Sequence, residues 1–346
     1  MTRDDMSPTL DSQIKEFALA EGADLFGVAP VERYAEYGMQ VQERMEETGA
    51  TSEDFMIARE DTSFFARLVT AENTLPEAKA IIVIGAYAYD ELAAHTYQGP
   101  ELRGKIARTY SYYPVVRQIA EAVTKFLRNR GYAAVHGQDV PLKYVADRIG
   151  LGCYGKHGVL LTERYGSYVA LRAVISNAPL AVTQSEKVQL CRDCELCTRT
   201  CPTGALYAPY KVNPRLCLNP ITRRIDHIAP EIRPKMGNRI HGCDICQEVC
   251  PANRGLTPRK PDPRSGFDPQ HHASHKELGG IERSPELLRL LSSEYPQIIR
   301  RNAVIALANT GWGRKDVLPA IRANMETCGD DLRSYFQWAV DTLSDH

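Results

Sequence analysis

The placement of the cysteines constrains this chain more than any other feature. Eight of the ten cysteines lie between Cys191 and Cys250. The first four follow the spacing C-x2-C-x2-C-x3-C-P, which ends at Pro202. In this spacing three thiolates bind one [4Fe-4S] cluster and the fourth binds a second cluster. The segment therefore predicts two clusters.

A later half-repeat supplies the remaining ligands. The spacing C-x2-C-x3-C-P recurs and ends at Pro251, but Ile240 occupies the position where a full repeat has one more cysteine. Cys217 is the nearby cysteine that can replace it. We therefore predict two complete ligand sets. The first is Cys191, Cys194, Cys197 and Cys250, and the second is Cys201, Cys217, Cys243 and Cys246.

Structural zinc and disulfides are the alternative explanations of this pattern. Paired C-x2-C motifs also build tetrahedral zinc sites. Zinc does not explain the third cysteine at the same spacing or the following x3-Cys-Pro, and disulfide frameworks belong mainly to small secreted chains. Iron-sulfur clusters are therefore the favoured interpretation.

Composition agrees with a globular protein that keeps its thiols reduced. The 346 residues are 43% hydrophobic, which supports real cores, and the net charge of -1 gives no overall attraction to nucleic acid or anionic membrane. The polar opening residues contain no apolar segment of a secretory signal, and no apolar run approaches the length of a membrane span. We expect a cytoplasmic monomer without a membrane partner.

Apolar periodicity predicts an α/β domain before the cysteines. Helical spacing appears over residues 12–21 and from Pro114 to Arg130, and strands are expected at 24–29, 80–84 and 132–135. Helices that alternate with strands indicate an α/β sandwich over a mixed sheet.

A glycine-dense turn runs from Gly150 to His157, ahead of an alternating segment at 166–175. Its spacing matches neither the dinucleotide-binding fingerprint nor the phosphate-binding loop of nucleotide triphosphatases. Nucleotide binding is therefore not expected at this turn.

The ordered set of motifs resembles the epoxyqueuosine reductase family over roughly residues 100 to 255. The segments that carry the resemblance are Gly150–His157, Gly166-Ser167, the cysteine run, Met236–Ile240 and Gly242–Pro251. Members of this family, which are relatives of the reductive dehalogenases, bind cobalamin beside two [4Fe-4S] clusters and reduce a modified nucleoside in tRNA. The resemblance implies a cobalamin-binding α/β domain of the reductive-dehalogenase type with a ferredoxin-like double-cluster insert.

The resemblance also implies site residues. The positions expected to approach the corrin are Gly152, Lys156, His157, Leu160, Leu171 and Asn219. The family carries an aspartate proton donor fourteen positions before the first glycine of its turn, and this chain has His136 there. Asp139 lies three residues later, so either residue is a candidate proton donor.

Four regions follow from these motifs. We expect a catalytic domain at 1–183, a double-cluster domain at 184–255, a proline-rich linker at 256–283 and a HEAT-like helical domain at 284–346. A basic ridge on the tail and linker is expected to bind tRNA; its members are Arg300, Arg301, Arg314, Lys315, Arg322, Arg259 and Lys260.

Two function classes remain open at this stage. The first is a cobalamin-dependent reductase of epoxyqueuosine in tRNA, or of another organic substrate, fed by a low-potential donor of the ferredoxin or flavodoxin type. The second is an iron-sulfur electron carrier or reductive activator of a corrinoid protein. Bound corrin in the purified protein distinguishes the two.

Overall fold

The computed structural model describes residues 8–51, 54, 70–91, 102–137, 140–224, 226–266, 285–311 and 313–345. Asp139, one of the two candidate proton donors, lies outside the described residues.

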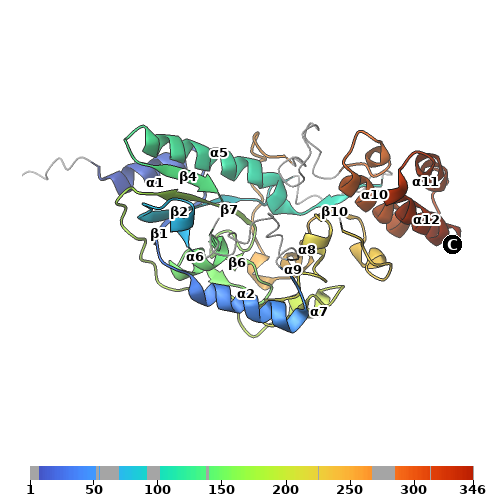
Figure 1. Cartoon of the computed structure of the whole chain (residues 1–346), viewed down its shortest axis with the longest axis horizontal. Coiled ribbons are helices and arrows are strands. Elements are labelled where there is room, and N and C mark those ends of the chain that lie inside the picture. The colour runs from blue at the N-terminus through green and yellow to red at the C-terminus, as the bar shows by residue number, and fades with distance from the viewer. Residues whose placement is uncertain are drawn as a thin grey trace, which may run out of the picture.

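A four-stranded sheet lies at the centre of the N-terminal part of the chain (Figure 1). Its strand order is β1-β2-β7-β4, and each neighbouring pair is antiparallel. The strand bounds are β1 (Leu25–Pro30), β2 (Ala80–Tyr87), β7 (Val169–Ser176) and β4 (Ala134–Gly137). Every residue of β2 is buried, as its continuous β-branched run predicted.

Helices cover both faces of the sheet. On one face, α1 (Leu10–Ala20) and α5 (Arg108–Arg128) pack against Ile82 and Ile84. On the other face, Ile81 and Val83 contact the core beneath α6 (Leu142–Arg148). The short strands β5 (Cys153–Tyr154) and β6 (Leu160–Leu161) and the helices α2 (Ala35–Thr48) and η1 (Ala71–Asn73) complete this part. The predicted α/β class is confirmed.

Helix α5 differs from its predicted start. It begins at Arg108, so Pro114 lies inside it rather than at its first turn. The backbone N–H of Arg108 donates a 2.8 Å hydrogen bond to Asp244 Oδ2. A carboxylate at this position satisfies one of the unpaired N–H groups of the first turn and favours the positive end of the helix dipole. The stabilising partner is distant in sequence, so local patterns did not indicate it.

The cysteine-rich segment folds into short elements around loops. They are α7 (Leu196–Thr200), β8 (Leu206–Ala208), β9 (Lys211–Val212), α8 (Leu218–Ile221), η2 (Arg233–Met236), β10 (Arg239–His241), α9 (Ile245–Glu248) and η3 (Pro251–Asn253). Strand β10 pairs in parallel with β3 (Lys105–Ile106), directly before α5. This pairing attaches the cysteine-rich segment to the α/β part.

The start of the proline-rich linker packs back onto the α/β part. The hydroxyl of Tyr87 donates to the carbonyl of Thr257 at 3.0 Å, and the guanidinium of Arg259 lies 2.6 Å from the carboxylate of Asp24. Arg259, an expected member of the basic ridge, is therefore paired with a carboxylate of the α/β part, which offsets its charge.

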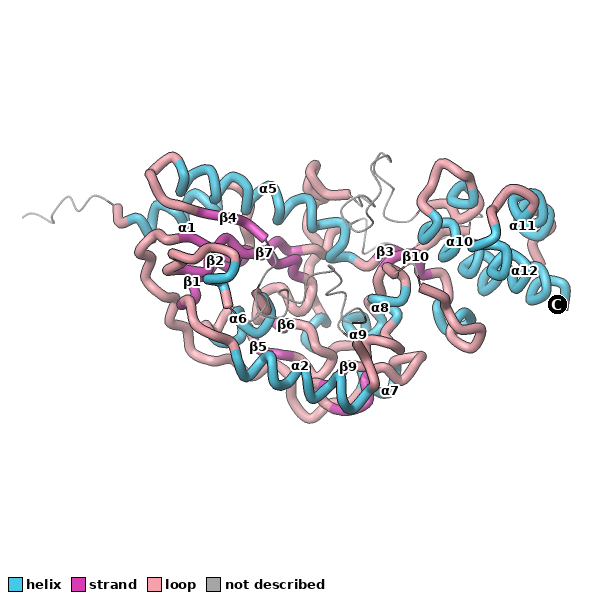
Figure 2. The backbone as a smooth tube through the Cα atoms, viewed as in Figure 1, coloured by secondary structure: helices cyan, strands magenta, loops and turns pink. Residues whose placement is uncertain are grey.

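The tail is helical, as predicted, with η5 (Arg289–Leu291), α10 (Gln297–Thr310), α11 (Val317–Met325) and α12 (Asp330–Ser344). Figure 2 shows these helices at the end of the molecule opposite to α1. Helix α12 contacts both α10 and α11. No helix within the described ranges is long and apolar enough to cross a membrane.

The prediction that Arg300 and Arg301 belong to a basic ridge on the surface of the tail is wrong. Their side chains are buried, at 7% and 2% exposure, and cannot meet phosphates. Arg300 donates to the carbonyl of Leu291, and Arg301 donates to backbone carbonyls of the cysteine-rich segment. Periodicity placed both residues on a helix but did not show that its basic side faces the protein.

Candidate metal centre

The first predicted cysteine set gathers where α7 meets α9. Cys197 lies in α7, and Cys250 follows α9. Burial raises the pKa of the Cys197 thiol. Neighbouring thiols raise it further, in the order Cys191, Cys250 and Cys194. Cys197 is therefore close enough to the other three members of its set for their charges to act on its thiol.

The second predicted set gathers in the same way. Burial raises the pKa of Cys217 to about 12, and the thiols of Cys243 and Cys201 add to the shift. Burial also raises the pKa of Cys246, with further contributions from Cys217 and Cys243. A smaller contribution to Cys246 comes from Cys197 of the first set. The two sets are therefore neighbours.

The donor chemistry of both sets fits iron-sulfur clusters. A buried thiol favours its protonated form, whereas coordinated iron stabilises the thiolate. At Cys201, burial is outweighed by hydrogen bonds from the Thr203 hydroxyl and nearby backbone N–H groups, which lower the pKa of the thiol. Within the described part of the chain, no three His, Cys, Asp or Glu side chains form a site for a single metal ion.

Lys156 connects the glycine-dense turn to the first set. Its backbone N–H donates to Cys191 Sγ at 3.4 Å. Its ammonium donates to the carbonyls of Arg192 and Cys194, at 3.1 and 3.3 Å. The resemblance implied a corrin contact for Lys156, and the structure gives this residue partners in the first cysteine loop.

An ion pair that sequence reasoning missed joins α5 to the second set. Asp244 lies between Cys243 and Cys246, and its Oδ2 accepts from the Arg108 guanidinium at 3.1 Å. The guanidinium also lies 4.8 Å from the ring centroid of Tyr168. Burial raises the pKa of the Asp244 carboxyl, and the charge of Arg108 opposes that shift. The motif around Asp244 was visible in the sequence, but nothing in it indicated Arg108 as the partner.

Asn219, a predicted corrin contact, belongs to a network beside Cys217. The hydroxyl of Tyr110 donates to Asn219 Oδ1 at 2.6 Å and accepts from the Arg223 guanidinium at 2.6 Å. Tyr110 is 4% exposed, and burial raises the pKa of its hydroxyl above its ordinary value. The Asn219 side chain is thus held by protein partners.

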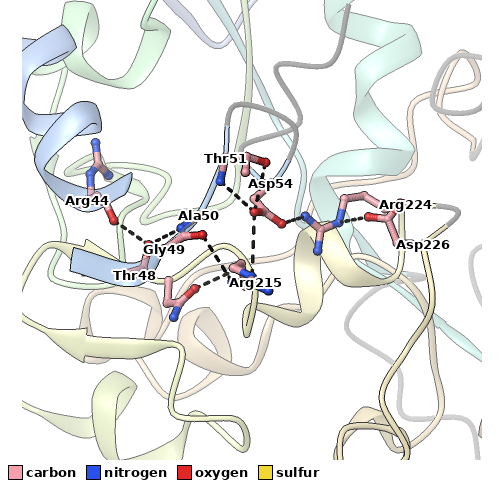
Figure 3. A network of polar contacts seen from close by, with 10 residues as sticks. Arg44, Thr48, Gly49, Ala50, Thr51, Asp54, Arg215, Arg224 and Asp226 are labelled. Carbon is pink, nitrogen blue, oxygen red and sulfur yellow. Dashed lines mark hydrogen bonds and ion pairs between the residues drawn. The ribbon is translucent and has the colours of Figure 1, made fainter. Parts of the chain in front are cut away.

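A second polar network joins the end of α2 to the residues that flank Cys217 (Figure 3). The carboxylate of Asp54 accepts from the Arg224 guanidinium and from the backbone N–H of Thr51. Arg215 donates to the carbonyl of Gly49 at 3.3 Å. The segment that carries Cys217 is therefore tied to the α/β part on this side.

The imidazole of His157 carries a buried hydrogen-bond donor. Its Nδ1 accepts from the backbone N–H of Val159 at 3.2 Å, which leaves the proton of the neutral ring on Nε2. The Nε2 atom is buried and has no hydrogen-bond partner among the described residues. Burial lowers the pKa of His157 to about 4, with a further contribution from Lys143. A neutral imidazole with a free N–H fits a ligand that presents an acceptor.

The remaining predicted corrin contacts lie in the core. Leu160 and Leu171 belong to the apolar cluster on the α6 face of the sheet and are 2% and 8% exposed. A Cβ added to Gly152 would lie 2.3 Å from the carbonyl oxygen of Leu161. Glycine at position 152 is therefore required by the close approach of β5 and β6.

His136 lies on the other side of the sheet. It pairs with Val174, which faces α5, whereas Leu171 faces α6. Its Nδ1 accepts from Arg172 at 3.4 Å, and burial followed by the charge of Arg172 lowers its pKa. The structure thus separates His136 from Leu160 and Leu171.

Comparison with protein families identifies the double-cluster segment. Residues 190–253 match a family described as a 4Fe-4S double cluster binding domain. This match covers the predicted cysteine sets, and it agrees with the preference for clusters over zinc.

Curated relatives support the resemblance. The chain is 33% identical over 183 residues to the epoxyqueuosine reductase of Bacillus subtilis strain 168, covering 50% of this chain and 47% of the relative. It is 28% identical over 247 residues to the epoxyqueuosine reductase of Pseudomonas aeruginosa, covering 66% of each chain. The first of these alignments therefore spans about half the length of the relative.

Solved structures extend the similarity to the whole fold. An epoxyqueuosine reductase crystallised with an epoxyqueuosine-modified tRNA-Tyr stem loop matches with a TM-score of 0.76 and 23% identity, over 97% of this chain and 99% of that chain. The Streptococcus thermophilus epoxyqueuosine reductase matches with a TM-score of 0.76 and 24% identity, over 97% and 91%. The chain thus has the epoxyqueuosine reductase fold.

Proposed function

We propose that this protein is a reductase that uses two [4Fe-4S] clusters and cobalamin to reduce epoxyqueuosine to queuosine in tRNA. The observation that supports it most is the match of residues 190–253 to a 4Fe-4S double cluster binding domain, beside an α/β domain of the epoxyqueuosine reductase fold. The similarity to curated enzymes of that name supports the same reaction.

The proposed reaction removes the epoxide oxygen as water and leaves an alkene, which consumes two electrons and two protons. Cobalamin, when bound, supplies the metal centre that reacts with the organic substrate. The cysteine sets bind the clusters that store and transfer electrons. A low-potential donor of the ferredoxin or flavodoxin type would supply the electrons to a monomeric enzyme.

The residues proposed to approach the corrin are Gly152, Lys156, His157, Leu160, Leu171 and Asn219. His157 supports this proposal most directly, because its buried Nε2–H has no acceptor in the part of the protein that the structure describes. Corrin side chains carry amide oxygens, which accept such a hydrogen bond. Lys156 and Asn219 also have protein partners, which would hold the loops beside the corrin in place.

The test is anaerobic reconstitution with iron, sulfide and cobalamin, followed by an assay on tRNA that carries epoxyqueuosine. We expect about eight irons per chain, from two four-iron clusters, together with bound corrin. Nucleoside analysis of the tRNA should show conversion to queuosine that depends on a low-potential reductant.

Two outcomes would contradict the proposal. Two clusters without corrin after reconstitution would favour the electron carrier. Bound corrin with no turnover of the modified tRNA would show that a different organic compound is the substrate.

A further inference from the structure

The first helix of the tail, α10, makes direct contact with the segments that carry the second cysteine set. Asn302 lies in this helix and is fully buried, at 0% exposure. Its Nδ2 donates to the carbonyl of Thr222 at 2.7 Å and to the carbonyl of Ile240 at 2.8 Å. One side-chain amide therefore joins two stretches that are separate in sequence.

Both stretches lead directly to cysteines of the second set. Thr222 directly follows α8, the short helix that Cys217 precedes, and Ile240 lies in β10, just before Cys243. The hydroxyl of Thr222 also accepts from the backbone N–H of Gly242 at 2.8 Å. The three hydrogen bonds fix the Cys217 segment against the Cys243 segment.

Arg301 orients the amide of Asn302. Its Nε donates to Asn302 Oδ1 at 3.1 Å, so the amide nitrogen is the atom that faces the two carbonyls. The same guanidinium donates to the carbonyls of Ile221 and Asp226, at 3.2 and 2.8 Å. All hydrogen-bonding atoms of the Asn302 side chain are therefore used, and its orientation is fixed.

The two sets differ in how much outside support they need. Three members of the first set lie within one short stretch, Cys191 to Cys197. The second set draws on three separate stretches, around Cys201, Cys217 and Cys243. A ligand set assembled from separate stretches depends more on contacts that hold those stretches together.

We propose that Asn302 is a positioning residue for the second cluster, and that the helical tail is a structural part of that cluster's binding site. This inference rests on the proposed assignment of the two cysteine sets. It gives the tail a role in cluster binding that does not depend on any contact with tRNA.

The test compares Asn302→Ala with Asn309→Ala in the full-length protein after anaerobic reconstitution. Asn309 is a matched control because it lies in the same helix and also donates to two carbonyls, those of Arg233 and Gly237, at 2.9 and 3.0 Å. Neither carbonyl adjoins a cysteine. Iron and sulfide content, Mössbauer spectra and anaerobic redox titration report on the clusters without an activity assay.

We expect the iron content of Asn302→Ala to be about four per chain, compared with about eight in the parent, because only the first cluster is retained. Asn309→Ala should retain about eight. Thr222→Val is a milder second variant, which keeps the side-chain shape but removes the acceptor for Gly242. It should shift one of the two midpoint potentials, since hydrogen bonding and solvent exposure set them.

The inference is overturned if Asn302→Ala keeps both clusters with unchanged potentials, or if Asn309→Ala loses as much iron. Loss of both clusters together in Asn302→Ala would also overturn it, because that result indicates general unfolding. If Asn302→Ala does not fold, unchanged potentials in Thr222→Val decide against the inference. A parent protein that binds fewer than two clusters would instead contradict the proposed function.

Discussion

At the scale of single residues, substitution of each of the two candidate proton donors is expected to affect turnover differently. His136 faces α5 and contacts Arg172, on the opposite side of the sheet from Leu160 and Leu171. We therefore expect His136→Asn to retain turnover of the modified tRNA. Asp139→Asn should lower the rate by about 10^2 to 10^4, the usual contribution of a positioned acid.

Iron content and corrin binding are the controls for this pair, and both should match the parent in each variant. Loss of turnover in His136→Asn with full activity in Asp139→Asn would reverse the assignment. Full activity in both variants would place the donor elsewhere.

The burial of His157 predicts that the stability of the protein depends on pH. Burial lowers its pKa to about 4, whereas an unfolded chain has the ordinary value near 6.5. Between these values the unfolded state binds more protons than the folded state. The contribution of neutral His157 to the free energy of unfolding is therefore fully present above about pH 6.5, and it declines as the pH falls toward 4. The expected loss between pH 7 and pH 5 is about 2 kcal/mol.

Denaturant midpoints at pH 7 and pH 5 measure this loss, and His157→Gln should reduce the difference between them. His227 is exposed, so His227→Gln is a control that should keep the parent's difference. An equal pH effect in parent and His157→Gln would assign the acid sensitivity to other groups.

Sequence reasoning leads to candidate ligand residues more readily than to the residues that hold them in place. The cysteine spacing indicated both sets because cluster ligation imposes a local pattern. The pairing of Arg108 with Asp244 and the bonds of Asn302 join residues far apart in the chain. Only the folded structure brings such partners together, so no local pattern indicates them.

At the scale of elements, the tight turn before Cys243 is expected to require glycine at position 242. Gly242 has a φ of +73°, and an added Cβ would lie 2.5 Å from the Tyr110 ring and 2.6 Å from the Ala107 side chain. Gly242→Ala therefore forces β10 away from the start of α5. We expect loss of the second cluster, measured as a fall from about eight irons to about four.

Gly255 provides a matched control. Its φ is +76°, but no atom of the described ranges lies within 4 Å of an added Cβ. Gly255→Ala should cost only about 1 kcal/mol of backbone strain and keep both clusters. Equal iron loss in both variants would show that the backbone conformation, rather than crowding at Tyr110, is responsible.

The predicted elements were most reliable where periodicity was strong. Strand β2 was evident from its β-branched run, and the apolar face of α5 was evident from Val116 to Leu127. The start of α5 was not, because Pro114 favours a first turn and Asp244 is a distant partner. Element identity followed from local composition, whereas this boundary followed from tertiary contacts.

At the scale of the whole molecule, the tail and linker serve more as packing elements than the sequence suggested. Arg259 pairs with Asp24, and Arg301 is buried against the cysteine-rich segment. Charge counts along a sequence do not distinguish a solvated arginine from one that holds two parts of a chain together. The predicted helices of the tail were nevertheless present, because their apolar spacing is local.

The last prediction concerns the part of the basic ridge that remains exposed. Lys315 and Arg322 are exposed on the tail, whereas the Arg314 guanidinium is paired with Asp316 at 2.8 Å, so Lys315 and Arg322 are the members chosen for the test. The double variant Lys315→Gln, Arg322→Gln should weaken tRNA binding and reduce the slope of log affinity against log salt by about two, because each phosphate contact releases about one counterion. Cluster content should not change.

The control is Lys15→Gln, Lys125→Gln, on α1 and α5 at the other end of the molecule (Figure 1), which should bind tRNA like the parent. Unchanged affinity and slope in the tail variant would leave the tail with a structural role alone.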